Sequence, residues 1–596
     1  MIRPSSGQRL SFFALVCFVT GCGTCDAGVD DLGGNSNDGG NGSGNNNAGG
    51  STGDFMADGG GTSGCTTCSA DLHQILDCDG NFIQECPPET GCGAGGTCVP
   101  ACQSAAENKS TIGCDFYSMT PGVIAESRGS CFAVMVANTW TTPISLQAEY
   151  AGQSIDASAY TYVPTGSGAG LTYQPLAGGT LAPGQLGILF LSKYESGDIF
   201  QIDCPVPQAL EINTHVDDGT GAYPGVTGLG NAFHITTTAP IVAYDVYPWG
   251  GSPSFVSSAT LLIPTPAWTT NYVTADGWDA NYGNPWTQIV AAEDATTVTF
   301  VPVAAVNGGG GLPAGAANTP LTFTLNRGQA AQFLQVTRLA GSVIDADKPV
   351  GVWGGASCMN IPAPSVGFCD AGHQQLLGVQ NLGNEYLVAR YPSRGGDDNA
   401  PVTFVGVVDG TTLVADPPLP GVPATLNRGQ VVTMSTTEPF NVKAQDADHP
   451  FYVAAYMTGS GMGSGIGDPE YVNIVPPLQY LNSYLFATDP TYRYTSLVFK
   501  RKKDANGFFQ DVNLDCMGPV TGWIPVGTGG QYEVARFNIV QGGAPVGSCD
   551  NGVHTATSDV PFGLSVWGYD QDVSYGYPAG MSVKAINTVV VPPVPQ

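Results

Sequence analysis

One short phrase recurs four times in this chain, and it constrains the fold more than any other feature of the sequence. Each copy has a turn, a proline, an apolar run rich in β-branched and aromatic residues, and a glycine. The four prolines, roughly one hundred residues apart, are Pro240, Pro349, Pro450 and Pro561. Because proline cannot donate to a β-ladder, we expect each one at the first position of a buried strand. A period of this length predicts a repeat architecture.

Other pieces of sequence keep the same period. The pentapeptide LNRGQ occurs at 325–329 and again at 426–430, and aromatic strand-like pieces such as NEYLVAR at 384–390 recur upstream of the phrase. Asp409-Gly410, between two strand-like runs, is a two-residue hairpin signal. We therefore predict four units. Their approximate bounds are 115–256, 257–372, 373–470 and 471–582.

The residues from about 103 onward are typical of β-structure. Val, Thr, Tyr, Phe and Gly dominate, several runs alternate with period two, and no amphipathic helix stands out. We predict an all-β fold. Each unit forms either a pair of four-stranded β-propeller blades or one of several tandem β-sandwiches. We favour the propeller because strand-like pieces at 114–120 and 576–585 can meet to close a ring.

The N-terminus reads as an export signal followed by a tether. Residues 1–21 combine Arg3 and Arg9 with a short apolar run, and they end before Cys22 in a pattern that resembles the lipobox of bacterial lipoproteins. We predict cleavage and lipidation at Cys22, the alternative being an ordinary signal peptide cut elsewhere. Residues 22–64 are rich in Gly and Asn and are predicted to be a flexible tether. The expected location is the outer membrane or cell surface, with the lipid as the only membrane contact.

Residues 65–102 are predicted to be a disulfide-rich module. They hold seven cysteines in an exported chain, and so short a segment has too little core to fold without cross-links. Zinc binding through Cys65-x-x-Cys68 is the alternative. Cys114 brings the module's cysteines to eight. Further along the chain we expect three local pairs: Cys131 with Cys204, Cys358 with Cys369, and Cys516 with Cys549.

The passage IDADKPVGVWGGASCMNIPAPSVGFCDAGHQQLLGVQNLGNEYLVARYPSR at 344–394 resembles the N-terminal domain family of IgGFc-binding proteins. The shared marks are the DKPV strand, the Gly-Gly-x-x-Cys that follows it, the Pro-rich bridge to Cys369-Asp370, and the Gly-x-x-Tyr-Leu-Val strand; the placement of His373 departs slightly. The resemblance spans roughly 105–585, which makes 103–585 the repeat domain and 586–596 a tail. It implies an extracellular recognition domain and carries no catalytic motif.

Signals for chemistry are few. The sequence contains no His-Glu-x-x-His, and the glycine-rich run at 459–467 is followed by strand signals instead of a helix, so we predict a loop there. Acidic pairs recur in register at Asp345/Asp347 and at Asp446/Asp448. Turn hydrogen bonding is the simpler explanation of these pairs, and calcium binding is the alternative. We expect no cofactor.

Charge and aromatic residues narrow the choice of partners. A formal net charge of −30 disfavours nucleic acid and anionic lipid. The basic run at 500–503 is predicted to be a solvated hairpin tip, the alternative being a local docking spot for an acidic partner. Trp268, Trp278 and Trp286 crowd one loop-rich stretch and are the candidate ligand surface.

Together these observations predict a surface-tethered recognition or adhesion protein without enzyme activity, whose ligand is an extracellular protein or glycan. Two alternatives stay open. One is a carbohydrate-active enzyme on a propeller scaffold, which needs carboxylates from separate units to meet in one pocket. The other is a structural cell-surface coat protein.

Overall fold

The computed structural model describes residues 65–594 except 167–169, 217–225, 252–253, 396–397 and 463–464. The predicted signal peptide, the tether and Cys22 therefore lie outside the described residues. Within the described part of the chain, no helix is long and apolar enough to cross a membrane. The fold class is all-β, as the sequence predicted.

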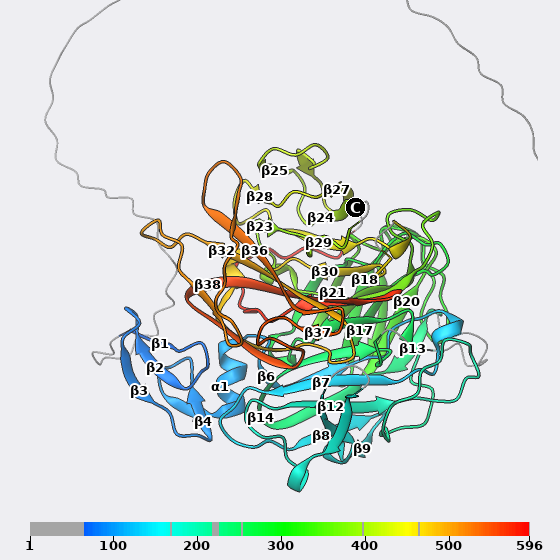
Figure 1. Ribbon diagram of the computed structural model, residues 1–596. Coiled ribbons are helices and arrows are strands. Elements are labelled where there is room, and N and C mark those ends of the chain that lie inside the picture. Colours follow the sequence, from blue (N-terminus) through cyan, green and yellow to red (C-terminus); the bar gives the residue numbers. More distant parts are fainter. Residues whose placement is uncertain are drawn as a thin grey trace, which may run out of the picture. The chain divides into compact units, whose positions relative to one another are not determined.

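Long strands carry the recurring phrase. Three of them are β14 (Phe233–Tyr247), β21 (Val343–Met359) and β38 (Val553–Asp570), while the third copy is divided into β28 (Phe440–Ala444) and β29 (Phe451–Met457) (Figure 1). The prediction that proline begins the strand was wrong for β14, β21 and β38, because Pro240, Pro349 and Pro561 lie inside them. At these points the register to the neighbouring strand shifts. The strand passes from one sheet to another there, so neither ladder needs the missing N–H.

The same strand pairing occurs in each of the four segments that contain the phrase. The outer sheet joins the first half of the long strand to the first, third and fourth strands of the segment. The inner sheet joins the second half to the second, fifth and last strands. Because apolar side chains of both sheets face each other, each segment buries a core between its two sheets.

The strands of the first two segments follow this scheme. The first segment contains β6 (Gly113–Ser118), β7 (Phe132–Asn138), β8 (Leu146–Tyr150), β9 (Gln153–Ile155), β12 (Leu186–Ser192), β14 and β15 (Ser258–Leu261), with β10 (Thr161–Thr165) and β11 (Thr172–Pro175) at the edge. The second contains β16 (Thr269–Val273), β17 (Pro285–Ala291), β18 (Thr296–Val301), β19 (Leu321–Leu325), β20 (Gln329–Leu334), β21 and β22 (Asp370–Gln375). In addition, β13 (Gly228–Asn231) pairs with β20, so the first segment adds a strand to the second.

The last two segments repeat it. The third contains β23 (Glu385–Val388), β24 (Ala400–Gly406), β25 (Thr411–Asp416), β26 (Thr425–Leu426), β27 (Val431–Thr436), β28, β29 and β30 (Glu470–Asn473). The fourth contains β31 (Leu481–Ala487), β32 (Tyr494–Lys502), β33 (Val512–Leu514), β34 (Gly518–Pro519), β36 (Tyr532–Gln541), β38 and β39 (Val573–Pro578), with β35 (Ile524–Val526) and β37 (Ala544–Pro545) on β36.

The last strands of the segments, β15, β22, β30 and β39, pack beside one another in a closed circuit. Hydrogen bonds join them: the Gln374 side-chain amide donates to the carbonyls of Ala259 and Gly576, at 3.0 and 2.9 Å. The two ends of the repeat region also meet, because Thr111 N–H donates to the carbonyl of Met581 at 3.0 Å. The inner sheets thus surround a common centre as propeller blades do, while the shared long strand of each segment is a feature of the sandwich alternative.

A recurring turn precedes the fifth strand. In both LNRGQ copies the glutamine side-chain carbonyl accepts the N–H three residues before it, Asn326 in one copy and Asn427 in the other, at 2.8 and 3.0 Å. The glycine before it has φ +76° in both copies, a left-handed conformation that favours glycine. Both copies of the pentapeptide therefore form the same turn.

The N-terminal module has five short strands and one helix. They are β1 (Thr66–Cys68), β2 (Gln74–Asp77), β3 (Phe82–Glu85), β4 (Thr90–Cys92), β5 (Cys98–Pro100) and α1 (Ala101–Asn108). Its disulfides are Cys65–Cys78, Cys68–Cys92, Cys86–Cys98 and Cys102–Cys114. All four cysteine pairs are thus oxidised, which leaves no thiolate for the zinc alternative. The helix is eight residues long, too short for a periodic pattern, and the sequence did not reveal it.

Short 3₁₀ turns complete the described secondary structure: η1 (Ala125–Ser127), η2 (Ala157–Tyr160), η4 (Ala177–Gly179), η6 (Thr265–Ala267), η7 (Val379–Asn381), η8 (Ser460–Met462) and η9 (Pro477–Gln479).

The predicted tail docks on the second segment. There the Asn271 side chain donates to the carbonyl of Val591 at 2.8 Å and accepts the Val591 N–H at 2.9 Å.

Candidate binding site

The four turns that lead into the central strands converge on one cavity. They are the turns before β15, β22, β30 and β39, and they contribute Phe255 and Val256, Phe368 and Cys369, Asp468, and Asp572 respectively. The cavity measures about 200 Å³ and is completed by Ile124, Phe200 and Tyr282. Because each segment contributes the residues at the same point of its repeat, the site is a product of the whole circuit of strands.

Four of the residues that line the cavity have a left-handed backbone conformation. Phe255, Val256, Phe368 and Asp572 have φ of +41°, +56°, +67° and +57°. A non-glycine residue pays for a positive φ, and such residues gather at functional sites. The Cys358–Cys369 disulfide ties the Phe368 turn to β21. The structure therefore holds these turns in place with covalent and steric constraints.

Aromatic rings form the walls. Tyr282, Phe368 and Phe255 are 60%, 59% and 37% exposed, which is unusual for side chains of this size. The Phe255 and Phe200 ring centroids lie 5.2 Å apart. The Tyr282 hydroxyl donates to the Glu126 carboxylate, which turns the ring edge toward an acidic neighbour. A cluster of exposed aromatic rings beside a cavity is typical of a binding surface.

Two carboxylates lie among these rings. Asp468 accepts the Ser460 N–H at 2.8 Å, and Asp572 accepts the Ser460 hydroxyl at 3.1 Å, so one serine positions both. Burial, together with the charge of Asp572, raises the pKa of Asp468 to about 6. Neither carboxylate takes part in an ion pair within the described part of the chain. The cavity therefore carries negative charge, and no cationic side chain of the described residues forms an ion pair with either carboxylate.

Two more acids are buried at the start of the central strands. Asp370 begins β22 and accepts the Ser574 N–H at 2.9 Å through one oxygen, while its other oxygen has no hydrogen-bond partner. Glu470 begins β30 and is fully buried. Burial raises the pKa of both well above the usual range, and for Asp370 the charges of Asp468 and Glu470 add to this. Three of the four segments thus bring carboxylates to the centre.

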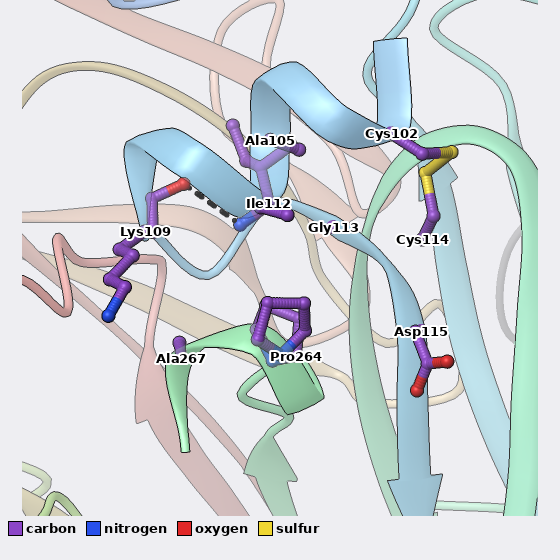
Figure 2. A pocket seen from close by; sticks show the side chains of 12 residues that line it. Cys102, Ala105, Lys109, Ile112, Gly113, Cys114, Asp115, Pro264 and Ala267 are labelled. Atoms are coloured by element: carbon purple, nitrogen blue, oxygen red, sulfur yellow. Dashed lines mark hydrogen bonds between the residues drawn. A yellow bond between two sulfur atoms is a disulfide. The ribbon is translucent and has the colours of Figure 1, made fainter. Parts of the chain in front are cut away.

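A smaller apolar cavity of about 100 Å³ lies between α1, the start of β6 and η6. Figure 2 shows Lys109 and Asp115 at its two ends and the Cys102–Cys114 disulfide beside it. Its wall between them is formed by alanine, isoleucine and proline side chains, such as Ala105, Ile112 and Pro264. It offers little besides packing, and we place the candidate site at the central cavity.

The structure does not bring the three predicted tryptophans to the surface. Trp268, Trp278 and Trp286 are 6%, 7% and 0% exposed. The indole N–H groups of Trp268 and Trp286 donate to the carbonyls of Ile263 and Gly122, both at 2.9 Å. They belong to the core and do not form the ligand surface that the sequence predicted, because the loop-rich stretch around them packs inward. The Phe255 and Phe368 turns were missed, although each stands directly before the last strand of its repeat.

The other predicted site residues are placed as follows. The structure pairs Cys131 with Cys204, Cys358 with Cys369, and Cys516 with Cys549. The described residues contain one group with metal-ligand spacing, namely Asp515, Cys516 and His554, and its sulfur is in a disulfide. The acidic pairs act in turns and strands: Asp347 accepts the Thr297 N–H at 2.8 Å, and Asp446 accepts the Asp448 N–H at 3.0 Å.

The basic run at 500–503 is not a solvated hairpin tip over its whole length, as the sequence predicted. Lys500 and Arg501 lie within β32 and are buried. The Arg501 guanidinium lies 4.0 Å from the Trp523 ring centroid and 2.6 Å from a Glu533 oxygen. The protein therefore uses this charge internally.

The all-β fold, the disulfides and the aromatic cavity together define a disulfide-bonded binding protein. The family described as IgGFc binding protein matches residues 258–568, and the chain belongs to that family. The resemblance seen in the sequence is thus confirmed. No curated protein matches the chain. Membership of a binding family indicates a recognition role with an extracellular protein partner. Together with the seven disulfides among the described residues, it indicates an extracellular or secreted protein.

Proposed function

We propose that this protein is a surface-anchored, non-catalytic recognition protein that binds an extracellular protein at the central cavity. The observation that carries the proposal is the convergence of exposed Phe255, Phe368 and Tyr282 around Asp468 and Asp572. Aromatic side chains dominate the binding energy of protein interfaces, provided that they are held rigidly. Here the turns that carry Phe255 and Phe368 are tied into the central strands, so little conformational entropy is lost on binding.

The anchor is the second part of the proposal. Lipidation of Cys22 would attach the folded part to the membrane through the Gly- and Asn-rich segment at 22–64. We propose export to the outer membrane or cell surface with this lipid as the membrane attachment. Labelling of cells with a radioactive fatty acid tests it: the full chain should carry label, and Cys22→Ser should not. Label on the Cys22→Ser protein would contradict the anchor.

Biolayer interferometry tests the binding function. The purified full chain is offered antibody Fc, mucin and purified surface polysaccharides. We expect saturable binding to a protein of this panel, and we expect Phe255→Ala/Phe368→Ala to weaken it about tenfold or more. The control is Phe82→Ala/Phe508→Ala, which removes two rings that are at least as exposed and lie outside the cavity, and it should leave binding unchanged. A flat response to the whole panel would favour a structural coat protein.

A glycan-active enzyme is the second candidate function. One specific observation favours it: Asp468 and Asp572 come from different segments and line one cavity, and the pKa of Asp468 is raised to about 6, as a general acid requires. Release of reducing ends from the polysaccharide panel, abolished by Asp468→Asn, would support it. Binding is preferred because the cavity lining is otherwise apolar and offers few groups to sugar hydroxyls.

A further inference from the structure

We propose that the central cavity takes a basic side chain, lysine or arginine, presented by an apolar surface of the protein partner. This inference rests on the proposed binding function and names the chemistry of the residue that the partner inserts. Three observations support it: the size of the cavity, its uncompensated charge and its aromatic walls.

The size of the cavity matches one side chain. Its volume of about 200 Å³ is below the range of roughly 300–1,000 Å³ that is typical of small-molecule sites. A long side chain such as lysine or arginine fits into such a space with its methylene groups along the walls. The rest of the partner then lies on the rim, where Tyr282 and Phe368 are most exposed.

The charge of the cavity requires a cation. Asp468 and Asp572 share Ser460 as a hydrogen-bond donor. The cation that acts on Asp468 from within the chain is Arg394, whose guanidinium is already bound to Asp398 at 2.9 Å. A lysine ammonium or an arginine guanidinium would supply the missing positive charge and the missing donors. An acidic partner is excluded by the same two carboxylates and by the net charge of −30.

The walls suit a cation as well as its methylene groups. An ammonium or guanidinium group is attracted to the face of an aromatic ring, and its stem packs on apolar surface. The protein uses the same combination internally: Arg394 lies 5.0 Å from the Tyr391 ring centroid beside Asp398, and Arg501 lies between Trp523 and Glu533. The central cavity has the aromatic rings and the carboxylates of such a site without the cation.

Saturation-transfer NMR on the full chain tests the inference with three peptides. They are Ac-Gly-Gly-Lys-Gly-Gly-NH2 and its analogues with norleucine or Nε-acetyl-lysine in place of lysine. We expect the lysine peptide to bind with a dissociation constant on the order of 1 mM. The two uncharged analogues should bind at least about tenfold more weakly. Equal binding of all three peptides would overturn the inference.

Matched variants separate the cavity from the general negative charge. Asp468→Asn/Asp572→Asn should weaken the binding of the lysine peptide about tenfold. Glu89→Gln/Asp559→Asn removes the same formal charge at exposed positions outside the cavity and should change nothing. Equal loss in both double variants would show non-specific attraction and overturn the proposal. Thermal melts of both double variants confirm that they fold.

The same variants distinguish this inference from the proposed function. If Phe255→Ala/Phe368→Ala abolishes binding of the protein ligand while Asp468→Asn/Asp572→Asn leaves it intact, the recognition function stands and the basic side chain is wrong. If no protein of the panel binds, the recognition function itself fails, whatever the peptides do. If both double variants lose the protein ligand and the lysine peptide, both statements hold.

Discussion

The hydroxyl of Tyr386 donates to the carbonyl of Phe451, the residue after Pro450, at 2.6 Å. It also accepts the N–H of Gly383 at 3.0 Å. The equivalent tyrosines of the neighbouring segments, Tyr272 and Tyr484, donate to the carbonyls of Val350 and Phe562 in the same way. Each tyrosine thus fixes the point where the chain crosses from the outer to the inner sheet. In the first segment the position is Phe116, which has no hydroxyl.

Tyr386→Phe should therefore lower the free energy of unfolding by about 1–3 kcal/mol, because it leaves a buried N–H and a buried carbonyl without their partner. Differential scanning calorimetry of the variant and of the control Tyr282→Phe measures the effect. Tyr282 is exposed, so the control should melt with the wild type. An unchanged melting temperature for Tyr386→Phe would show that the hydroxyl does not hold the crossing.

The buried carboxylates make the stability depend on pH. The folded-state pKa of Asp468 is raised to about 6 by burial and by the charge of Asp572, while hydrogen bonds from Ser460 and the charge of Arg394 act to lower it. A carboxyl group whose pKa is raised on folding contributes stability below about pH 4 and loses it as the pH rises through about 6. We expect Asp468→Asn to remove a loss on the order of 2 kcal/mol between about pH 4 and pH 6. Melting curves across this range check it, and a parallel pH profile of variant and wild type would contradict it.

Lys500 should have the opposite pH dependence. Burial, aided by the charge of Arg536, lowers the pKa of Lys500 to about 7. Because this pKa is lower in the folded chain than in the unfolded chain, stability is lost as the pH falls through about 7. We expect Lys500→Met to raise the melting temperature by a few degrees at pH 6 and by less at pH 9. Lys584→Met, at an exposed position, is the control and should change neither value.

The Cys358–Cys369 disulfide should matter for binding more than the other local disulfides. It fixes the turn that carries Phe368, and it adjoins the cavity through Cys369. We expect Cys358→Ser/Cys369→Ser to lower the affinity for the protein ligand several-fold, because the Phe368 turn becomes more flexible. Cys516→Ser/Cys549→Ser breaks a disulfide that does not line the cavity and should leave affinity unchanged in the same interferometry assay. Equal affinity of the two double variants would show that the disulfide does not organise the cavity.

Chelation should leave the fold intact. Of the carboxylates considered for calcium, in the pairs Asp345/Asp347 and Asp446/Asp448, those of Asp345, Asp347 and Asp446 accept hydrogen bonds from the chain itself, such as Asn271 to Asp345 at 3.2 Å. We expect EDTA to change the melting temperature by less than about 1 °C. A clear drop in the melting temperature that calcium reverses would show that these acidic pairs bind calcium.

The sequence predicted those features that depend on neighbouring residues. The cysteines of the pairs Cys358–Cys369 and Cys516–Cys549, which it predicted, lie close together in the sequence. It was less informative where one residue type suits two environments. Trp278 in a Gly- and Asn-rich stretch reads as exposed, yet it packs against Tyr456, with ring centroids 4.9 Å apart. In the same way Lys500 reads as solvated and is buried in a strand.

By itself the sequence determined the β-structure, the period of the repeat and the turn chemistry, because strand propensity, proline and the Gly-Gln turns act over a few residues. Only the tertiary structure decided that Pro240 marks a crossing between sheets instead of a strand start, since that depends on the strands that pair on either side. It also decided that Phe255, Phe368, Asp468 and Asp572 share one cavity. These residues meet because the circuit of central strands closes where β39 packs beside β15, a contact between strands that are far apart in the sequence.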